Sequence, residues 1–161
     1  MSISEKANIF TIAQLGDLEL FKRKFSPNDI HIKSDAGSSL LHYAIAGRNY
    51  AIANFLLKNG IEVNLTNTDG QTPLHYIGEF PDIATAQTIL EKGGNLNIRD
   101  KYGNNALWTA VFNCKGKYYD MVELFMPYKP DVGTKNKAGR SPLDFAIQTG
   151  NDKLIALLQK G

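Results

Sequence analysis

The sequence predicts an all-α solenoid of about five helix-turn-helix units joined by extended β-turn loops. Glycines recur at a nearly fixed spacing, a leucine follows each of them by four residues, and the segments around these anchors resemble one another. A period of about 20–50 residues is typical of repeat architectures, in which each unit packs only on its neighbours. The anchor glycines are Gly37, Gly70, Gly103 and Gly139, spaced 33, 33 and 36 residues apart.

The first helix of each unit is expected to begin just after the anchor glycine. Thr72 and Ser141 can each cap a helix N-terminus, and each is followed by a proline. Proline is well tolerated at the first helical position, because the N–H that it lacks has no partner inside the helix. Apolar residues then recur at steps of three and four, which predicts one buried face for each first helix.

The second helix of each unit is expected to end at a glycine or a proline. Residues 50–58 form the clearest example, because Asn59 and Gly60 follow and glycine accepts the left-handed conformation that closes a helix. In the fourth unit Pro127 and Pro130 stand where the glycine would be, and proline ends a helix by removing an N–H donor.

The repeated segment resembles the ankyrin repeat, whose signature includes T-P-L-H-x-A at a period of about 33 residues. The third unit carries it as Thr-Pro-Leu-His-Tyr-Ile at residues 72–77, and the resemblance covers nearly the whole chain. It implies one domain over residues 1–161, with capping units at both ends. The expected unit boundaries are 1–33, 34–66, 67–99, 100–135 and 136–161. Residues 103–108 and 136–143 also resemble small bacterial ankyrin proteins that neutralise a toxin, called immunity proteins.

Composition and charge argue against several classes of function. The 18 Lys and Arg against 16 Asp and Glu give a net charge of only +2, so nucleic acid is not an expected partner. No apolar stretch approaches the roughly 20 residues that cross a membrane, and no signal peptide is evident. Cys114 is the single cysteine, which excludes an internal disulfide and favours a reducing cytoplasm.

We expect no enzymatic activity, no cofactor and no metal. His42 and His75 occupy the same repeat position, and the resemblance implies that they are neutral scaffold residues. His31 has no second ligand at a suitable spacing, and the common phosphate, dinucleotide and zinc motifs are absent from the sequence. Cys114 lies near Lys115 and Lys117, which would favour a reactive thiol, although an isolated cysteine is more often inert.

Two features mark the third to fifth units as the expected binding region. From Arg99 to Arg140 the sequence has eight basic and four acidic residues, which predicts either an ordinary solvated face or a patch that steers an acidic partner. In the fourth unit Trp108 replaces the repeat histidine, and three extra residues within 113–119 lengthen the turn between helices. Partly exposed aromatic residues are enriched at interface hot spots, while the alternative for Trp108 is packing against the next unit.

The sequence therefore predicts a non-enzymatic module that binds another protein and is monomeric when free. The resemblance implies that it neutralises a bacterial toxin, with an acidic toxin domain as a candidate partner. The alternatives are an adaptor or effector that scaffolds other proteins, and a small enzyme on an ankyrin scaffold. The predicted partner-binding residues are Phe80, Arg99, Lys101, Tyr102, Asn104, Trp108, Phe112, Tyr118, Tyr119, Lys135, Lys137 and Arg140.

Overall fold

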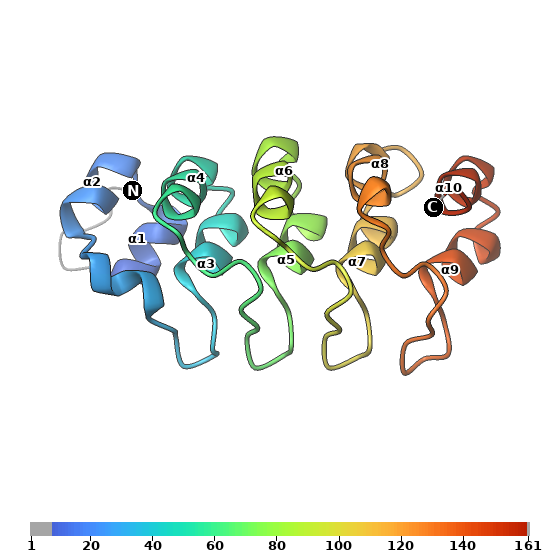
Figure 1. Cartoon of the computed structure of the whole chain (residues 1–161), viewed down its shortest axis with the longest axis horizontal. Coiled ribbons are helices and arrows are strands. Elements are labelled where there is room, and N and C mark those ends of the chain that lie inside the picture. The colour runs from blue at the N-terminus through green and yellow to red at the C-terminus, as the bar shows by residue number, and fades with distance from the viewer. Residues whose placement is uncertain (1–7, 161) are drawn as a thin grey trace.

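The computed structural model describes residues 8–160, and in this range it contains ten α-helices, two short 3₁₀ helices and no strand. The α-helices form five pairs that stand side by side in chain order, with the loop tips pointing away from the second helices (Figure 1). The predicted all-α solenoid is confirmed. The pairs define unit 1 (α1 Ile9–Leu15, α2 Leu18–Lys24), unit 2 (α3 Leu40–Ala46, α4 Tyr50–Lys58), unit 3 (α5 Pro73–Glu79, α6 Ile83–Glu91), unit 4 (α7 Ala106–Asn113, α8 Asp120–Phe125) and unit 5 (α9 Pro142–Gln148, α10 Asp152–Leu158). The 3₁₀ helices are Pro27–His31 and Met126–Tyr128.

The first helices begin where the capping residues predict. Thr72 and Ser141 are the N-caps of α5 and α9, and a proline follows each of them in the first turn. In α7 the cap is Asn105, whose side chain accepts a hydrogen bond from the Trp108 N–H at 2.9 Å. A polar cap therefore starts each of these helices, including the one that lacks the Thr-Pro pair.

Two buried histidines link units 2, 3 and 4. The Nδ1 atom of His42 accepts a hydrogen bond from the Ser39 N–H at 3.1 Å, so Nε2 carries the proton and donates to the Gln71 carbonyl at 3.0 Å. His75 repeats this arrangement one unit later, with its Nε2 atom 3.0 Å from the Asn104 carbonyl. Burial lowers the pKa of His42 to about 4 and also lowers the pKa of His75, so both imidazoles are neutral at pH 7.

Each loop tip is tied to the next by the backbone. The N–H groups of Thr68, Lys101 and Lys137 donate to carbonyls of the preceding tip at 2.9, 2.7 and 2.9 Å. Gly70 has a φ of +76°, and a Cβ atom there would lie 3.1 Å from the Asp100 Cα. The anchor glycine is thus needed both for its backbone conformation and for the close approach of the next tip.

The core runs without interruption through all five units. The leucines four residues after the first three anchor glycines, Leu41, Leu74 and Leu107, are fully buried. First helices approach one another closely where small residues face the neighbour. A Cβ atom on Gly78 would lie only 3.0 Å from the Ala110 backbone nitrogen. Within residues 8–160 no helix combines the length and apolar character needed to cross a membrane.

Candidate partner-binding surface

Three of the five basic residues predicted to meet a partner form ion pairs within the chain. Lys101 Nζ lies 2.8 Å from Asp69 Oδ1, and Lys135 Nζ lies 2.7 Å from Asp144 Oδ2. Arg99 Nη2 lies 3.2 Å from Asp131 Oδ2. Asp69 and Asp131 come from the loops next to those of Lys101 and Arg99, whereas Asp144 lies in the first turn of α9, directly after the loop that holds Lys135.

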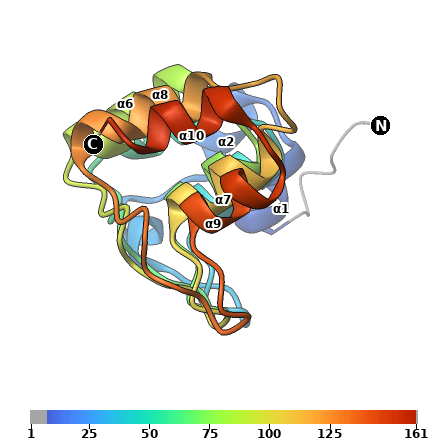
Figure 2. The same cartoon turned by 90° about the vertical axis from the view of Figure 1, so that its right-hand side faces the viewer.

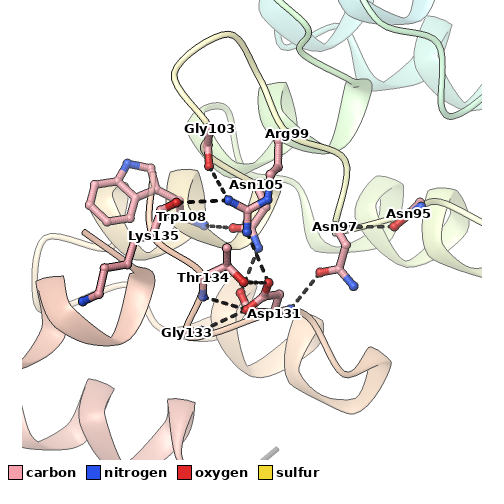
Figure 3. A network of polar contacts seen from close by, with 10 residues as sticks. All are labelled: Asn95, Asn97, Arg99, Gly103, Asn105, Trp108, Asp131, Gly133, Thr134 and Lys135. Atoms are coloured by element: carbon pink, nitrogen blue, oxygen red, sulfur yellow. Dashed lines mark hydrogen bonds and ion pairs between the residues drawn. The ribbon is translucent and has the colours of Figure 1, made fainter. Parts of the chain in front are cut away.

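Arg99 belongs to a polar network that joins units 4 and 5 (Figure 3). Its Nη1 atom donates to the Gly103 carbonyl at 3.0 Å, while Nη2 meets Asp131. Asp131 also accepts from the backbone N–H of Thr134 at 2.9 Å and from the Thr134 hydroxyl, and these bonds with Arg99 nearby hold the pKa of its carboxyl below the usual range. The Asn105 side chain donates to the Asp131 carbonyl at 2.8 Å. Arg99 is therefore a structural residue of this junction.

Asn104 and Trp108 are also used within the solenoid. The Asn104 side-chain oxygen accepts from Asn136 Nδ2 at 2.8 Å, in addition to the backbone bond from His75. Trp108 is half-buried, and its ring packs edge-on against Phe145 of unit 5 at a centroid distance of 5.7 Å. The structure therefore places these two side chains at the junction between units 4 and 5.

The remaining predicted residues differ in exposure. Phe112 and Tyr102 are each 57% exposed and Tyr118 is 68% exposed. Phe80 and Tyr119, expected to point outward, are half-buried and pack against the core. They do so because turns of neighbouring units lie next to each other.

Lys137 and Arg140 differ from the other three predicted basic residues. Among residues 8–160 neither of them forms an ion pair, and both are exposed on the tip of unit 5. They lie on the loop that the backbone joins to the tip of unit 4. Of the five basic residues predicted, these two are available to an acidic group of a partner.

Sequence reasoning missed a pocket of about 250 Å³ on the concave side of units 1 to 3. Two tyrosines at the same repeat position, Tyr43 of α3 and Tyr76 of α5, line it, and the Phe10 ring packs on Tyr43 at 5.0 Å. Its other lining residues come from α1, α3 and the first loop tip: Gln14, Ala36, Ser38, His42 and Ala46. A signal existed in the sequence, because the residue two positions after the anchor leucine is aromatic in units 2, 3 and 5 but small in unit 4.

A family profile described as "Ankyrin repeats (3 copies)" matches residues 9–100 and again residues 78–161, and so covers nearly all of the chain. The chain belongs to the ankyrin-repeat family. In this family the first helices and the loop tips form the concave surface, and here that surface holds the Tyr43–Tyr76 pocket. The ankyrin fold makes the chain a protein-protein interaction module.

Ankyrin proteins of several organisms are similar to this chain. A putative ankyrin repeat protein of Fowlpox virus, FPV024, is 34% identical over 121 residues, which are 74% of this chain and 20% of the viral protein. A putative ankyrin repeat protein of Rickettsia felis is 31% identical over 146 residues, 87% of this chain and 50% of that protein. Human Rabankyrin-5 is 30% identical over 136 residues, 76% of this chain and 11% of its own length. The chain spans half or less of these relatives.

The described units hold no cluster of potential metal ligands, and His42, His75 and Cys114 are packed into the fold. Across residues 8–160 no three His, Cys, Asp or Glu side chains are grouped so that they could hold a metal ion. His42 and His75 are fixed by hydrogen bonds to backbone groups, and Cys114 is only 3% exposed.

Proposed function

We propose that this ankyrin module binds a folded partner protein on its concave surface, with an apolar group of the partner in the Tyr43–Tyr76 pocket. The observation that carries the proposal is the pocket itself, which has tyrosine walls and lies between first helices and loop tips. Tyrosine is enriched among the residues that dominate binding energy, because it offers a large rigid ring and a polar end.

The second contact is electrostatic and lies at the other end of the same surface. Lys137 and Arg140 are exposed and unpaired by acidic residues of the described chain, so they fit carboxylates on the partner. Exposed charges at an interface act mainly on the rate of encounter and on its salt dependence. A partner that is apolar opposite units 1 to 3 and acidic opposite unit 5 would be held in one orientation.

A narrower proposal within this class is that the partner is a toxin that the module inhibits. Its support is the resemblance of residues 103–108 and 136–143 to immunity proteins, together with a surface able to cover a partner's site without chemistry of its own. We place the module in the cytoplasm, because its lone cysteine is buried and forms no disulfide. Scaffolding of other proteins is the alternative role, and assaying the captured partner for an activity that the module blocks separates the two.

The test is capture of the partner by tagged protein in the source cell, followed by calorimetric titration of the purified pair. Tyr43→Ala is expected to weaken binding at least tenfold, as a hot-spot residue does. Tyr128→Ala is the matched control, since Tyr128 is exposed on the short helix after α8, away from the concave surface. If Tyr43→Ala binds normally while Phe112→Ala does not, the site lies on units 4 and 5 instead.

A further inference from the structure

A pocket of about 350 Å³ lies between units 3 and 4, outside the concave surface, at the edge where first helices turn into second helices. The longer turn of unit 4, which contains the three-residue insertion, forms one wall and projects from this edge in Figure 2. This volume is within the range of about 300–1,000 Å³ that is usual for ligand sites. The residues that line it include Glu79, Ile83, Ala110, Cys114, Lys115 and Tyr118.

At two other junctions along this edge, a tyrosine of the chain reaches across to the next unit. The Tyr50 hydroxyl of unit 2 donates to the Phe80 carbonyl in the turn of unit 3, at 3.1 Å. The Tyr119 hydroxyl of unit 4 lies 3.1 Å from Asn151 Oδ1 in the turn of unit 5 and 2.9 Å from the Gly116 carbonyl in its own turn, so its single proton is shared between these two acceptors. Partial burial raises the pKa of Tyr50, as expected for a phenol that is packed in such a junction.

In unit 3 the same position holds Ile83. The repeat register shows this, because two buried residues begin two positions after each of Tyr50, Ile83 and Tyr119. These pairs are Ile52 and Ala53, Thr85 and Ala86, and Met121 and Val122. Isoleucine is shorter than tyrosine and has no hydroxyl, and Ile83 remains 42% exposed at the mouth of the pocket. The pocket thus occupies the place that a tyrosine ring fills at the neighbouring junctions.

We propose that this pocket binds a tyrosine side chain of a partner protein. The chain's own tyrosines show that this edge accepts a phenol ring whose hydroxyl bonds to the next turn. The floor of the pocket is apolar, with Ala110, Cys114 and Met121 each less than 5% exposed, and therefore suits the faces of the ring. The proposal rests on the proposed function in that the tyrosine belongs to a bound protein.

Cations lie beside aromatic rings, one tyrosine and one phenylalanine, at the two neighbouring junctions of this edge. Lys153 Nζ lies 4.3 Å from the centroid of the Tyr119 ring, and Arg48 lies 5.5 Å from that of Phe80. Lys115 lines the pocket between units 3 and 4 and, within residues 8–160, forms no ion pair. A cation near an aromatic face is attracted by the ring, so Lys115 complements a bound tyrosine.

The direct test titrates the full chain with p-cresol, the tyrosine side chain as a free molecule, and follows backbone amide shifts by NMR. We expect saturable binding with a dissociation constant on the order of 1 mM, with shifts centred on Ala110, Cys114 and Met121. Toluene, which lacks the hydroxyl, is expected to bind at least threefold more weakly. Absence of saturable shifts at these residues, or equal binding of toluene, overturns the proposal.

Two reciprocal substitutions locate the site. Ile83→Tyr fills the pocket from inside the chain and is expected to weaken p-cresol binding at least tenfold while raising the melting temperature. Tyr50→Ile creates the corresponding space between units 2 and 3 and is expected to add a second p-cresol site with shifts around Phe80. Unchanged p-cresol binding in Ile83→Tyr contradicts the proposal. If that variant does not fold, the p-cresol and toluene titrations of the unaltered chain decide whether the proposal holds.

The occupant is tested separately from the concave surface. Tyr43→Ala, which weakens the proposed concave contact, is expected to leave p-cresol binding unchanged, so failure of one proposal does not mimic failure of the other. With the captured partner, Ile83→Tyr is expected to weaken binding about tenfold. Unchanged partner binding in that variant, or self-association of the chain that p-cresol reverses, would show that the tyrosine does not come from a partner protein.

Discussion

The junctions that follow units 2 and 3 differ from the junction that follows unit 4 in how one unit is tied to the next. In the first two, a buried neutral histidine donates to a backbone carbonyl of the following unit. In the third, Trp108 replaces the histidine, and the half-exposed pair of Arg99 and Asp131 joins the units with help from Asn105. The same packing of helices is thus supported by two kinds of polar link, which should respond differently to pH and salt.

Removing a core leucine should lower the free energy of unfolding most, because the core is continuous through all the junctions. Leu74→Ala is expected to lower the free energy of unfolding by about 2–5 kcal/mol, since Leu74 is fully buried. Thr68→Ala, at an exposed tip, is the control and should change it by less than about 0.5 kcal/mol. Denaturant unfolding of the three proteins measures this, and similar losses in both variants would contradict the placement of the core.

Acid should weaken the histidine-linked junctions selectively. Because the folded chain holds His42 neutral with a pKa of about 4, the unfolded chain binds more protons between about pH 6.5 and pH 4. Stability therefore falls as the pH falls through this window, with a share for His42 of about 3 kcal/mol. His42→Gln should flatten the profile measured by denaturant unfolding at pH 7 and pH 4.5.

The charged link should not contribute to that loss. Hydrogen bonds lower the pKa of Asp131, so the stability that this carboxylate contributes is lost mainly as the pH falls below the ordinary aspartate pKa of about 3.9, which lies below the range from pH 7 to pH 4.5. An identical pH profile in wild type and His42→Gln would mean that the histidine link is not the acid-sensitive element.

Gly70, the anchor glycine of unit 3, lies at the histidine-linked junctions and should tolerate no branched side chain. Gly70→Val is expected to destabilise the chain by about 1–3 kcal/mol, because Gly70 has a φ of +76° and the next tip lies against it. Gly70→Ala should cost less, and Gly133→Ala is a control at a glycine with open space around it. The melting temperatures of the three variants measure this. If Gly133→Ala had the lowest melting temperature, the result would contradict the turn geometry at Gly70.

The charged link should give the smallest effect and the clearest salt dependence. Asp131→Asn is expected to cost about 1 kcal/mol or less, because partly exposed ion pairs contribute little. The loss should shrink further when salt screens the pair. The measurement compares melting temperatures of the variant and the wild type at low and high salt. A difference that is independent of salt would assign the role of Asp131 to its hydrogen bonds instead.

The sequence by itself determined the architecture, because the signals that specify it are local and periodic. The caps Thr72 and Ser141, the anchor glycines and the buried leucines predicted where helices begin, where the chain turns and which face is buried. Each unit contacts only its neighbours, so a structure predicted correctly for one repeat applies to the other repeats as well. The same period placed His42 and His75 at equivalent positions, and the resemblance to ankyrin repeats implied their neutral structural role.

Only the tertiary structure decided which of the variable side chains are free. Lys101 and Arg99 are basic in sequence, yet stacking of the units brings Asp69 and Asp131 within ion-pair distance of them. The two pockets also arise between units: Tyr43 and Tyr76 of neighbouring units line one, and Ile83 and the turn of unit 4 line the other. Whether a gap stays open depends on the size and direction of side chains from two units at once, and that information lies in their packing rather than in either repeat alone.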